Sequence, residues 1–333
     1  MTVRRYLTRI FAARALGALL ALAALLQCLD LLDRASDVLA GGGGAAEVAR
    51  YAALRLPTLL GQAVPSLLDN RASFLTSRVW NVQAGALEFG IADLLWVTVM
   101  SSIIAMALAV PVAIGVALFL TQYAPKRLAR PFAAAVDLLA AVPSIVYGLW
   151  GAYIVITYLS SVQNGISGVL GWIPIFSTNR IITNSIFAGG VVLAIMILPI
   201  VTAISREVFD QTPLAHKEAA LALGATKWEM IRTAVLPFGR PGVISASMLG
   251  LGRALGETIA VLLIIREVRG DWTWSIFSGG NTFASRIARD AGEFDSPEKT
   301  GAYIAAGLVL FVLTFAVNAA ARVVIERRKA FTE

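Results

Sequence analysis

Long apolar segments recur along this chain and are separated by shorter, more polar stretches. Six of them lie at about residues 15–32, 94–120, 132–160, 184–204, 242–265 and 301–321. Each is close to or longer than the roughly 18–20 residues that cross a bilayer as a helix. The pattern therefore predicts an all-α integral membrane protein with six transmembrane helices.

Composition supports a membrane protein. Of the 333 residues, 58% are apolar and 15% are charged, and the mean hydropathy is +0.75. A soluble domain carries about 25% charged residues. The segment 15–32 follows a basic start and could be a signal peptide, but its apolar run exceeds the roughly 7–15 residues of a signal core and no cleavage site is clear. We therefore expect it to be retained as the first span.

The distribution of Lys and Arg predicts the orientation, since short cytoplasmic loops carry more of both. Segment 161–183 contains only Arg180, whereas segment 206–241 contains Arg206, Lys217, Lys227, Arg232 and Arg240. We expect 206–241, the N-terminus and the C-terminus to lie in the cytoplasm. The net charge of +7 does not indicate a nucleic-acid partner, because the basic residues cluster at the ends of the apolar segments.

Catalytic and metal chemistry have little support in the sequence. The chain has one cysteine, Cys28, and one histidine, His216, so we expect no internal disulfide, no metal site and no cofactor. No G-x-x-x-x-G-K-[ST] motif is present, and the glycines at 250, 252 and 256 lie in an apolar helix without a preceding strand. We expect a transport subunit without catalytic residues, and ATP chemistry would have to come from another polypeptide.

Two features inside the predicted spans have ordinary structural interpretations. Pro111, Pro143 and Pro199 are each expected to kink a helix. Asp137 lies about six residues into the third predicted span, and an acid within a membrane is a functional candidate by default. Its shallow position favours solvation or pairing with a basic loop residue.

The cytoplasmic segment 206–241 predicts two short helices. Thr212-Pro213 is typical of an N-cap followed by proline, and the first helix should end at Gly224. Thr226 and Glu229 fit a capping box, and the second helix should end before Pro237. Small residues and apolar anchors on the outward surface would let a partner protein approach closely; the residues expected there are Ala215, Ala219, Ala220, Ala222, Trp228, Met230 and Ile231.

The stretch EAALALGATKWEMIRTAVLP, residues 218–237, resembles the EAA loop of ABC-importer permeases. The matching positions are Glu218, Ala219, Ala220, Gly224, Leu236 and Pro237, while Ala234 stands where isoleucine is usual. This resemblance implies a type I ABC importer permease fold. It also implies that helices within 213–235 couple to an ATP-hydrolysing subunit by docking into its cleft.

A closer resemblance covers residues 74–328. The stretches FLTSRVWN, VPSIVYGLWG, LAIMILPIVTAISREVF, GLGRALGETIAV and NTFASRIA are similar to phosphate-specific ABC permeases of the PstC type. The resemblance implies half of the translocation pathway of an ATP-driven phosphate importer in the plasma membrane of a prokaryote. It also implies three partners: a sister permease of the PstA type, an ATPase dimer of the PstB type and an external phosphate-binding protein of the PstS type.

The resemblance and the apolar pattern together suggest a division of the chain. We expect residues 1–93 to contain the first transmembrane helix and an external loop, and residues 94–328 to form a five-helix permease core. Within that core, Asn281-Thr282 is expected to cap a helix before the last span.

Arg253 and Glu257 stand out within the fifth predicted span. If 242–265 is one helix, Arg253 lies near its middle, where insertion of arginine costs roughly 2.5–3.5 kcal/mol. Four residues separate it from Glu257, so the two side chains should share a face and partly neutralise each other. Gly252 and Gly256 form a small-xxx-small pair that should let a neighbouring helix approach.

We hypothesise that Arg253 contacts the transported phosphate, because a guanidinium stays charged and presents a planar fork to two oxygens. Glu257 would orient Arg253 and keep anion binding weak enough for release. An ion pair that only specifies packing would explain the same residues. Other functions also remain open: an ABC permease for another oxyanion such as sulfate or phosphonate, or an ion-coupled secondary transporter, which the docking segment disfavours.

Overall fold

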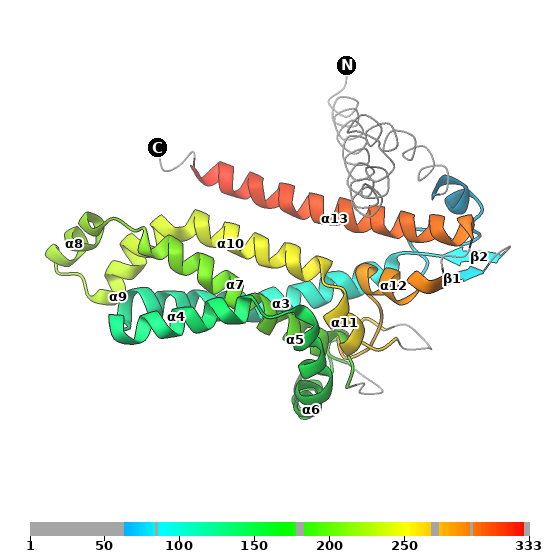
Figure 1. Ribbon diagram of the computed structural model, residues 1–333, viewed down its shortest axis with the longest axis horizontal. Coiled ribbons are helices and arrows are strands. Elements are labelled where there is room, and N and C mark those ends of the chain that lie inside the picture. Colours follow the sequence, from blue (N-terminus) through cyan, green and yellow to red (C-terminus); the bar gives the residue numbers. More distant parts are fainter. Residues whose placement is uncertain (1–62, 84–85, 178–182, 268–272, 294–295, 330–333) are drawn as a thin grey trace, which may run out of the picture. The chain divides into compact units, whose positions relative to one another are not determined.

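The computed structural model describes residues 63–83, 86–177, 183–267, 273–293 and 296–329, so the predicted first span at 15–32 lies outside the described residues (Figure 1). The described chain divides by its contacts into two compact units. We call them the bundle unit, Leu94–Ala288 with the residues from Asn318, and the hairpin unit, the described residues up to Asp93 with Arg289–Val317.

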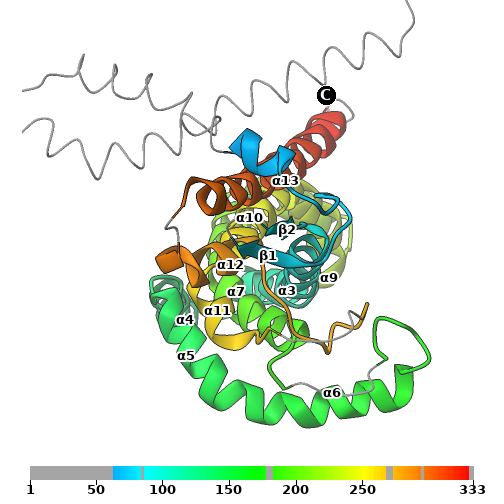
Figure 2. The same cartoon turned by 90° about the vertical axis from the view of Figure 1, so that its right-hand side faces the viewer.

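Every regular element among the described residues of the bundle unit is a helix. Its long helices lie side by side in both views (Figures 1 and 2); they are α3 (Ala92–Leu118), α4 (Lys126–Ala140), α7 (Ile186–Asp210) and α10 (Leu236–Gly256). Shorter elements complete it: η1 (Phe119–Tyr123), α5 (Ser144–Trp150), η2 (Gly151–Val155), α6 (Ile156–Leu170), α8 (Leu214–Ala222), α9 (Lys227–Met230), η3 (Ile231–Val235), α11 (Ile259–Ile264) and α12 (Phe283–Arg289). Elements α8 and α9 lie at one end of the bundle and α12 at the other (Figure 1).

Helix α7 forms the centre of the bundle core. It is apolar on nearly all faces, which is the pattern of a helix surrounded by other helices. Its fully buried residues pack with residues of α3, α5, η2 and α11. Helix α10 approaches α7 closely through glycines: a Cβ added to Gly250 would lie 2.9 Å from Val201. Bulkier residues at such positions would separate the two helices.

Five helices of the described residues are long and apolar enough to cross a membrane, so the chain is a multi-pass membrane protein. They are Ala92–Tyr123, Ser144–Leu170, Ile186–Asp210, Lys227–Gly256 and Lys299–Asn318. Three match the predicted spans at 94–120, 184–204 and 301–321 closely. Pro111 and Pro199 lie inside α3 and α7, as predicted.

The predicted third span at 132–160 is wrong, because the chain breaks at Pro143. Helix α4 ends at Ala140 and a new helix starts at Ser144, while Pro143 has φ −57° and ψ 138°. Proline disfavours a helical conformation in the residue before it, so Pro143 interrupts the helix rather than kinking it. The Tyr147 hydroxyl bridges the break by donating a hydrogen bond to the Leu139 carbonyl oxygen at 2.9 Å.

The predicted fifth span at 242–265 is also wrong at both ends. Its helix runs from Lys227 through the π-helical turn η3 into α10, and it stops at Gly256. The expected stop before Pro237 does not occur: this proline follows directly on the π-helical turn η3, and the helix continues through it. After a break at residues 257–258 the short helix α11 begins.

An ion pair joins α4 to α7 near the end of the bundle that carries α8. Arg206 Nη2 lies 3.2 Å from Asp137 Oδ2, and the two side chains are 20% and 51% exposed. Asp137 therefore pairs with a basic residue of segment 206–241, as its shallow position predicted.

The hairpin unit contains a small sheet that the all-helical prediction missed. Strand β1 (Trp80–Gln83) pairs antiparallel with β2 (Ala86–Phe89), and Trp80 stands opposite Phe89. The amide side chain of Asn70 donates to the Phe89 carbonyl oxygen at 2.7 Å and accepts from the Phe89 N–H at 3.0 Å. The alternation of large and polar residues in 80–89 is the signal that could have predicted these strands.

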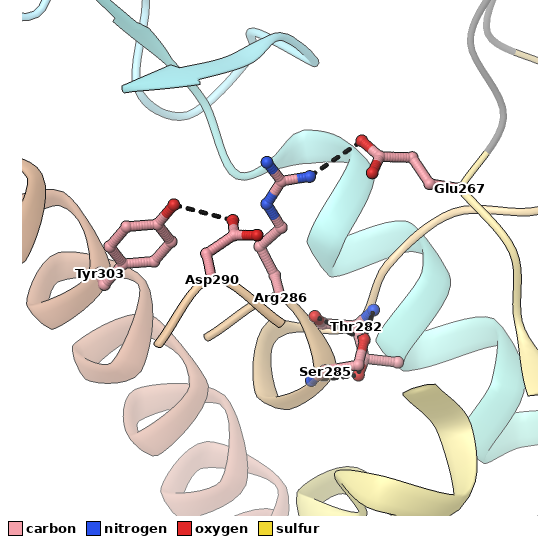
Figure 3. A network of polar contacts seen from close by, with 6 residues as sticks. All are labelled: Glu267, Thr282, Ser285, Arg286, Asp290 and Tyr303. Carbon is pink, nitrogen blue, oxygen red and sulfur yellow. Dashed lines mark hydrogen bonds and ion pairs between the residues drawn. The ribbon is translucent and has the colours of Figure 1, made fainter. Parts of the chain in front are cut away.

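Aromatic contacts stabilise the hairpin. The Trp80 ring centroid lies 5.5 Å from that of Phe89 and 5.4 Å from that of Tyr303, which belongs to α13 (Pro297–Lys329). The Tyr303 hydroxyl donates a hydrogen bond to Asp290 Oδ2 at 2.8 Å (Figure 3). Asp290 directly precedes the 3-10 turn η4 (Ala291–Glu293). A two-stranded hairpin alone is marginally stable, so these contacts account for its order.

Candidate functional site

The break between α10 and α11 is organised by Glu257. Its backbone is extended, with ψ 128°, and its side-chain Oε1 accepts a hydrogen bond from the Ala260 N–H at 3.2 Å. Glu257 is only 9% exposed. A carboxylate is favourable at a helix N-terminus because the first N–H groups there lack helical partners. Glu257 therefore caps α11.

Arg253 lies in the last turn of α10. A cation is favourable there, because the free carbonyl groups give this helix end a partial negative charge. The side chain is half-buried, and its Nε is buried without a hydrogen-bond partner. Within the described residues Arg253 forms no ion pair and no side-chain hydrogen bond.

The predicted pairing of Arg253 with Glu257 on one helix face is wrong. Because α10 ends at Gly256, the spacing of four residues does not bring the two side chains together. The free-energy cost of inserting an arginine at the centre of an uninterrupted helix also does not apply, because Arg253 lies in the last turn of α10. Each charge is instead stabilised by a helix end of opposite sign, and the Arg253 guanidinium is left available to another anion.

Tyr147 belongs to the surroundings of Arg253, although no motif in the sequence marks it as a site residue. The two side chains are close enough to interact electrostatically. Tyr147 itself is 8% exposed, and its hydroxyl donates a hydrogen bond to the Leu139 carbonyl oxygen. Close packing holds α5 here, since a Cβ added to Gly148 would lie 2.8 Å from the Ala260 Cα. The break in α10–α11 and the break at Pro143 therefore meet near Arg253.

Gly252 and Gly256 do not make the helix contact predicted for them within the described part of this chain. A Cβ added at either position would meet nothing within 4 Å. Gly250 makes the close contact with α7 instead. At Gly252 and Gly256 this face of α10 meets no described residue, and its packing against a helix of another subunit stays a prediction.

The chemistry of this region suits an oxyanion. A buried N–H donor without a partner is unfavourable, and a guanidinium has five donors in a planar fork. A tetrahedral oxyanion offers several acceptor oxygens to such a fork. Irregular backbone at membrane depth is tolerated where it is buried in protein or lines a cavity, and broken helices of this kind surround substrate sites in transporters.

The second candidate site is the segment from α8 to η3. Gly224 has φ +84°, a left-handed conformation that favours glycine, and it ends α8 as predicted. The capping box is confirmed: the Glu229 N–H donates to Thr226 Oγ1, and the Thr226 N–H donates to Glu229 Oε2 at 2.7 Å. Thr212 does not cap α8, because Pro213 occupies the N-cap and Thr212 is buried.

The outward surface of this segment is partly as predicted. Ala215, Ala219 and Ala222 are exposed, as is Glu218, and Ala220 is half-buried. Met230 and Ile231 are not exposed anchors; they pack in a core cluster with Phe209, Val235, Ala117 and Leu118. We call the exposed apolar residues the docking surface: Leu214 (68% exposed), Leu221 (47%), Leu223 (90%) and Trp228 (55%). The two remaining residues of the EAA pattern differ: Leu236 packs partly against that cluster, and Pro237 is exposed.

The opposite end of the bundle holds a polar cluster around α12. The Thr282 hydroxyl accepts from the Ser285 N–H at 3.1 Å, which confirms the predicted cap, and Asn281 beside it is buried. Arg286 Nη1 lies 2.8 Å from Glu267 Oε1 (Figure 3). The Phe283 N–H donates to Thr98 Oγ1 on α3 at 3.2 Å, so this cluster fixes α12 against a membrane-spanning helix.

Comparisons with known proteins agree with this geometry. The family model described as binding-protein-dependent transport system inner membrane component matches residues 109–330. A model for the lipopolysaccharide export system permease LptF/LptG matches residues 5–68 only. The phosphate transport system permease protein PstC 2 of Mycobacterium tuberculosis is 58% identical over 270 residues, which is 80% of this chain and 83% of that protein. PstC of Mesorhizobium japonicum is 39% identical over 302 residues, or 85% and 89% of the two chains.

A solved structure supports the fold. A chain of the MetNI methionine ABC transporter, in an inward-facing conformation, superposes with a TM-score of 0.51 at 15% identity. The match covers 71% of this chain and 94% of that one. At this identity the likeness concerns the fold alone, which is that of type I ABC importer permeases.

Proposed function

We propose a function from the premise that this chain belongs to the family of binding-protein-dependent transport system inner membrane components. It is a multi-pass transport subunit. We propose that its substrate is inorganic phosphate, and that it forms half of the pathway of an ATP-driven importer. The names of the relatives at 58% and 39% identity support phosphate, and the Arg253 side chain supports an oxyanion.

The observation that carries the proposal is the buried Nε of Arg253 without a partner, beside the broken helix. In the proposed mechanism Arg253 donates hydrogen bonds to phosphate as it passes. Glu257 fixes the break by capping α11, and its negative charge keeps anion binding weak enough for release. Arg253 would therefore act on the substrate. Glu257 would hold the break that follows the end of α10, where Arg253 lies.

The proposed assembly has four kinds of subunit. A sister permease of the PstA type supplies the other half of the pathway, and a PstS-type protein delivers phosphate from outside. An ATPase dimer of the PstB type hydrolyses ATP and receives the docking surface, where Leu223 and Trp228 are exposed beside the alanines of the EAA pattern. In this proposal α8, α9 and both termini lie in the cytoplasm of a prokaryote, and six spans cross its plasma membrane.

The test is uptake of labelled phosphate into vesicles that contain the complete transporter. We expect uptake that requires ATP and the ATPase subunit and that is inhibited by arsenate but not by sulfate. Stronger inhibition by sulfate than by arsenate would indicate another oxyanion as the substrate. Uptake without any ATPase subunit would indicate an ion-coupled secondary transporter.

A further inference from the structure

A groove opens on the bundle unit at the junction of η3 and α10, away from Arg253. Its volume is about 360 Å³, and it is lined by Ile114 of α3, Arg232 of η3, and Leu236, Pro237, Arg240, Val243 and Ile244 of α10. We call it the arginine groove. Helix α3 leaves room at this level, since a Cβ added to Gly115 would meet nothing within 4 Å.

The two arginines of the groove are available to a ligand. Both are exposed, and neither forms an ion pair or a side-chain hydrogen bond with a described residue. They lie eight residues apart, about 12 Å along a helix, so two long side chains can converge on one anionic group between them. The groove thus presents two uncompensated positive charges on one face.

The rest of the lining is apolar. Five of the seven lining residues carry no charge or hydrogen-bonding side chain: Ile114, Leu236, Pro237, Val243 and Ile244. A hydrated inorganic anion gains nothing from such walls, whereas an acyl chain gains about 0.8 kcal/mol for each CH₂ group removed from water. The two arginines suit the charged headgroup of a phospholipid, and the adjacent apolar walls suit its acyl chain.

The position of the groove along α10 agrees with a lipid headgroup. Residues 241–252 are uncharged, so Arg240 is the first charged residue that follows Arg253 toward the docking surface. Arg240 and Arg232 therefore lie on the docking-surface side of this uncharged stretch, where long basic side chains reach the headgroups of a bilayer. The direction of this side toward the cytoplasm rests on the proposed function.

We propose that the arginine groove binds an anionic phospholipid, with its phosphodiester headgroup between Arg232 and Arg240 and an acyl chain along Val243, Ile244 and Ile114. The bound lipid neutralises the two arginines beside η3, the turn that joins the docking surface to α10. It therefore occupies the segment through which motion of the ATPase would reach the membrane-spanning helix.

The experiment uses the complete transporter, purified in detergent, stripped of lipid and titrated with phosphatidylglycerol or phosphatidylcholine. Native mass spectrometry counts the bound lipids. Each arginine near an anionic lipid surface strengthens binding by about fivefold, so R232Q/R240Q is expected to weaken phosphatidylglycerol binding by about 25-fold. R232K/R240K, which keeps the charges, should retain most of the binding. R127Q/R130Q removes two exposed arginines of α4 outside the groove and should change nothing.

Several outcomes would overturn the proposal. Equal binding of the two lipids, or equal binding to wild type and R232Q/R240Q, would exclude a specific headgroup site. Displacement of phosphatidylglycerol by millimolar inorganic phosphate would indicate a free-phosphate site. Binding to the isolated full-length chain but not to the complete transporter would indicate that another subunit covers the groove. Lipid binding is measured without transport. A failure of the lipid proposal can therefore be distinguished from a failure of the proposed phosphate uptake.

Discussion

The carboxylate of Glu257 accepts a hydrogen bond from the Ala260 N–H at 3.2 Å, and Arg253 has no ion-pair partner among the described residues. The two charged residues of the GLGRALGETIAV stretch therefore have different tasks. One stabilises the start of α11, and the other presents free donors beside the helix break. This division leads to different predictions for the two residues.

Replacement of Glu257 should separate its capping role from its charge. Glu257→Gln keeps an oxygen that can accept from the Ala260 N–H, so we expect its thermal stability in detergent to stay close to wild type. Glu257→Ala loses the cap and should lose about 0.5–2 kcal/mol. Both variants should transport phosphate poorly or leak, because both lack the negative charge. Equal stability of the Ala and Gln variants would show that the hydrogen bond to Ala260 does not hold the break.

Replacement of Arg253 should lower transport strongly without harming assembly. Charge-assisted hydrogen bonds contribute about 1.5–3 kcal/mol, so Arg253→Gln should lower phosphate uptake by about 10- to 100-fold. Arg253→Lys keeps the charge but loses the fork, and it should also be impaired. Since Arg253 pairs with no described residue, neither variant should unfold the chain. Wild-type uptake at normal protein levels in either variant would refute the proposed role.

The sequence predicted the class of fold and the docking segment better than it predicted the substrate region. The left-handed Gly224 and the Thr226–Glu229 box are local features, and local sequence rules describe them. The break at Glu257 was missed because Gly256, at which α10 ends, was interpreted as half of a small-xxx-small contact and not as a helix stop, and an apolar run cannot be divided by periodicity alone. Tyr147 was missed because its relation to Arg253 depends on how α5 and α10 pack.

Asp137 should contribute little to transport. Its ion pair with Arg206 is partly exposed, and such pairs are worth about 0–1 kcal/mol. We expect Asp137→Asn to shift the thermal unfolding temperature only slightly and to leave phosphate uptake within about twofold of wild type. Arg253→Gln, measured in the same vesicles, provides the contrast. A large loss of uptake in Asp137→Asn would return this carboxylate to the list of candidate pathway residues.

Gly224 should matter through its backbone conformation alone. Its φ is +84°, and a Cβ there would meet nothing within 4 Å, so alanine introduces conformational strain without a clash. The left-handed conformation costs an alanine about 1–2 kcal/mol, whereas asparagine tolerates it better. We expect Gly224→Ala to weaken co-purification of the ATPase subunit and Gly224→Asn to weaken it less. If both variants retain the ATPase equally, the turn between α8 and α9 does not determine docking.

The glycines of α10 should differ according to which surface they face. Gly250→Ala places a methyl group 2.9 Å from Val201 and should destabilise the isolated chain by about 1–3 kcal/mol. Gly252→Ala meets nothing in the described residues and should leave that stability unchanged or raise it slightly, because alanine favours helix over glycine. The matched pair can be compared by thermal unfolding of the purified chain.

The same pair tests the predicted contact with a second permease subunit. If a partner helix packs against Gly252 and Gly256, a bulky Gly252→Leu should leave the isolated chain stable but reduce co-purification of the sister subunit, because the helices could no longer approach closely. An undiminished yield of the complex would mean that this face meets lipid. Arg253 directly follows Gly252 in α10. In that case its side chain would have to reach the pathway although α10 does not pack against the sister subunit at this level.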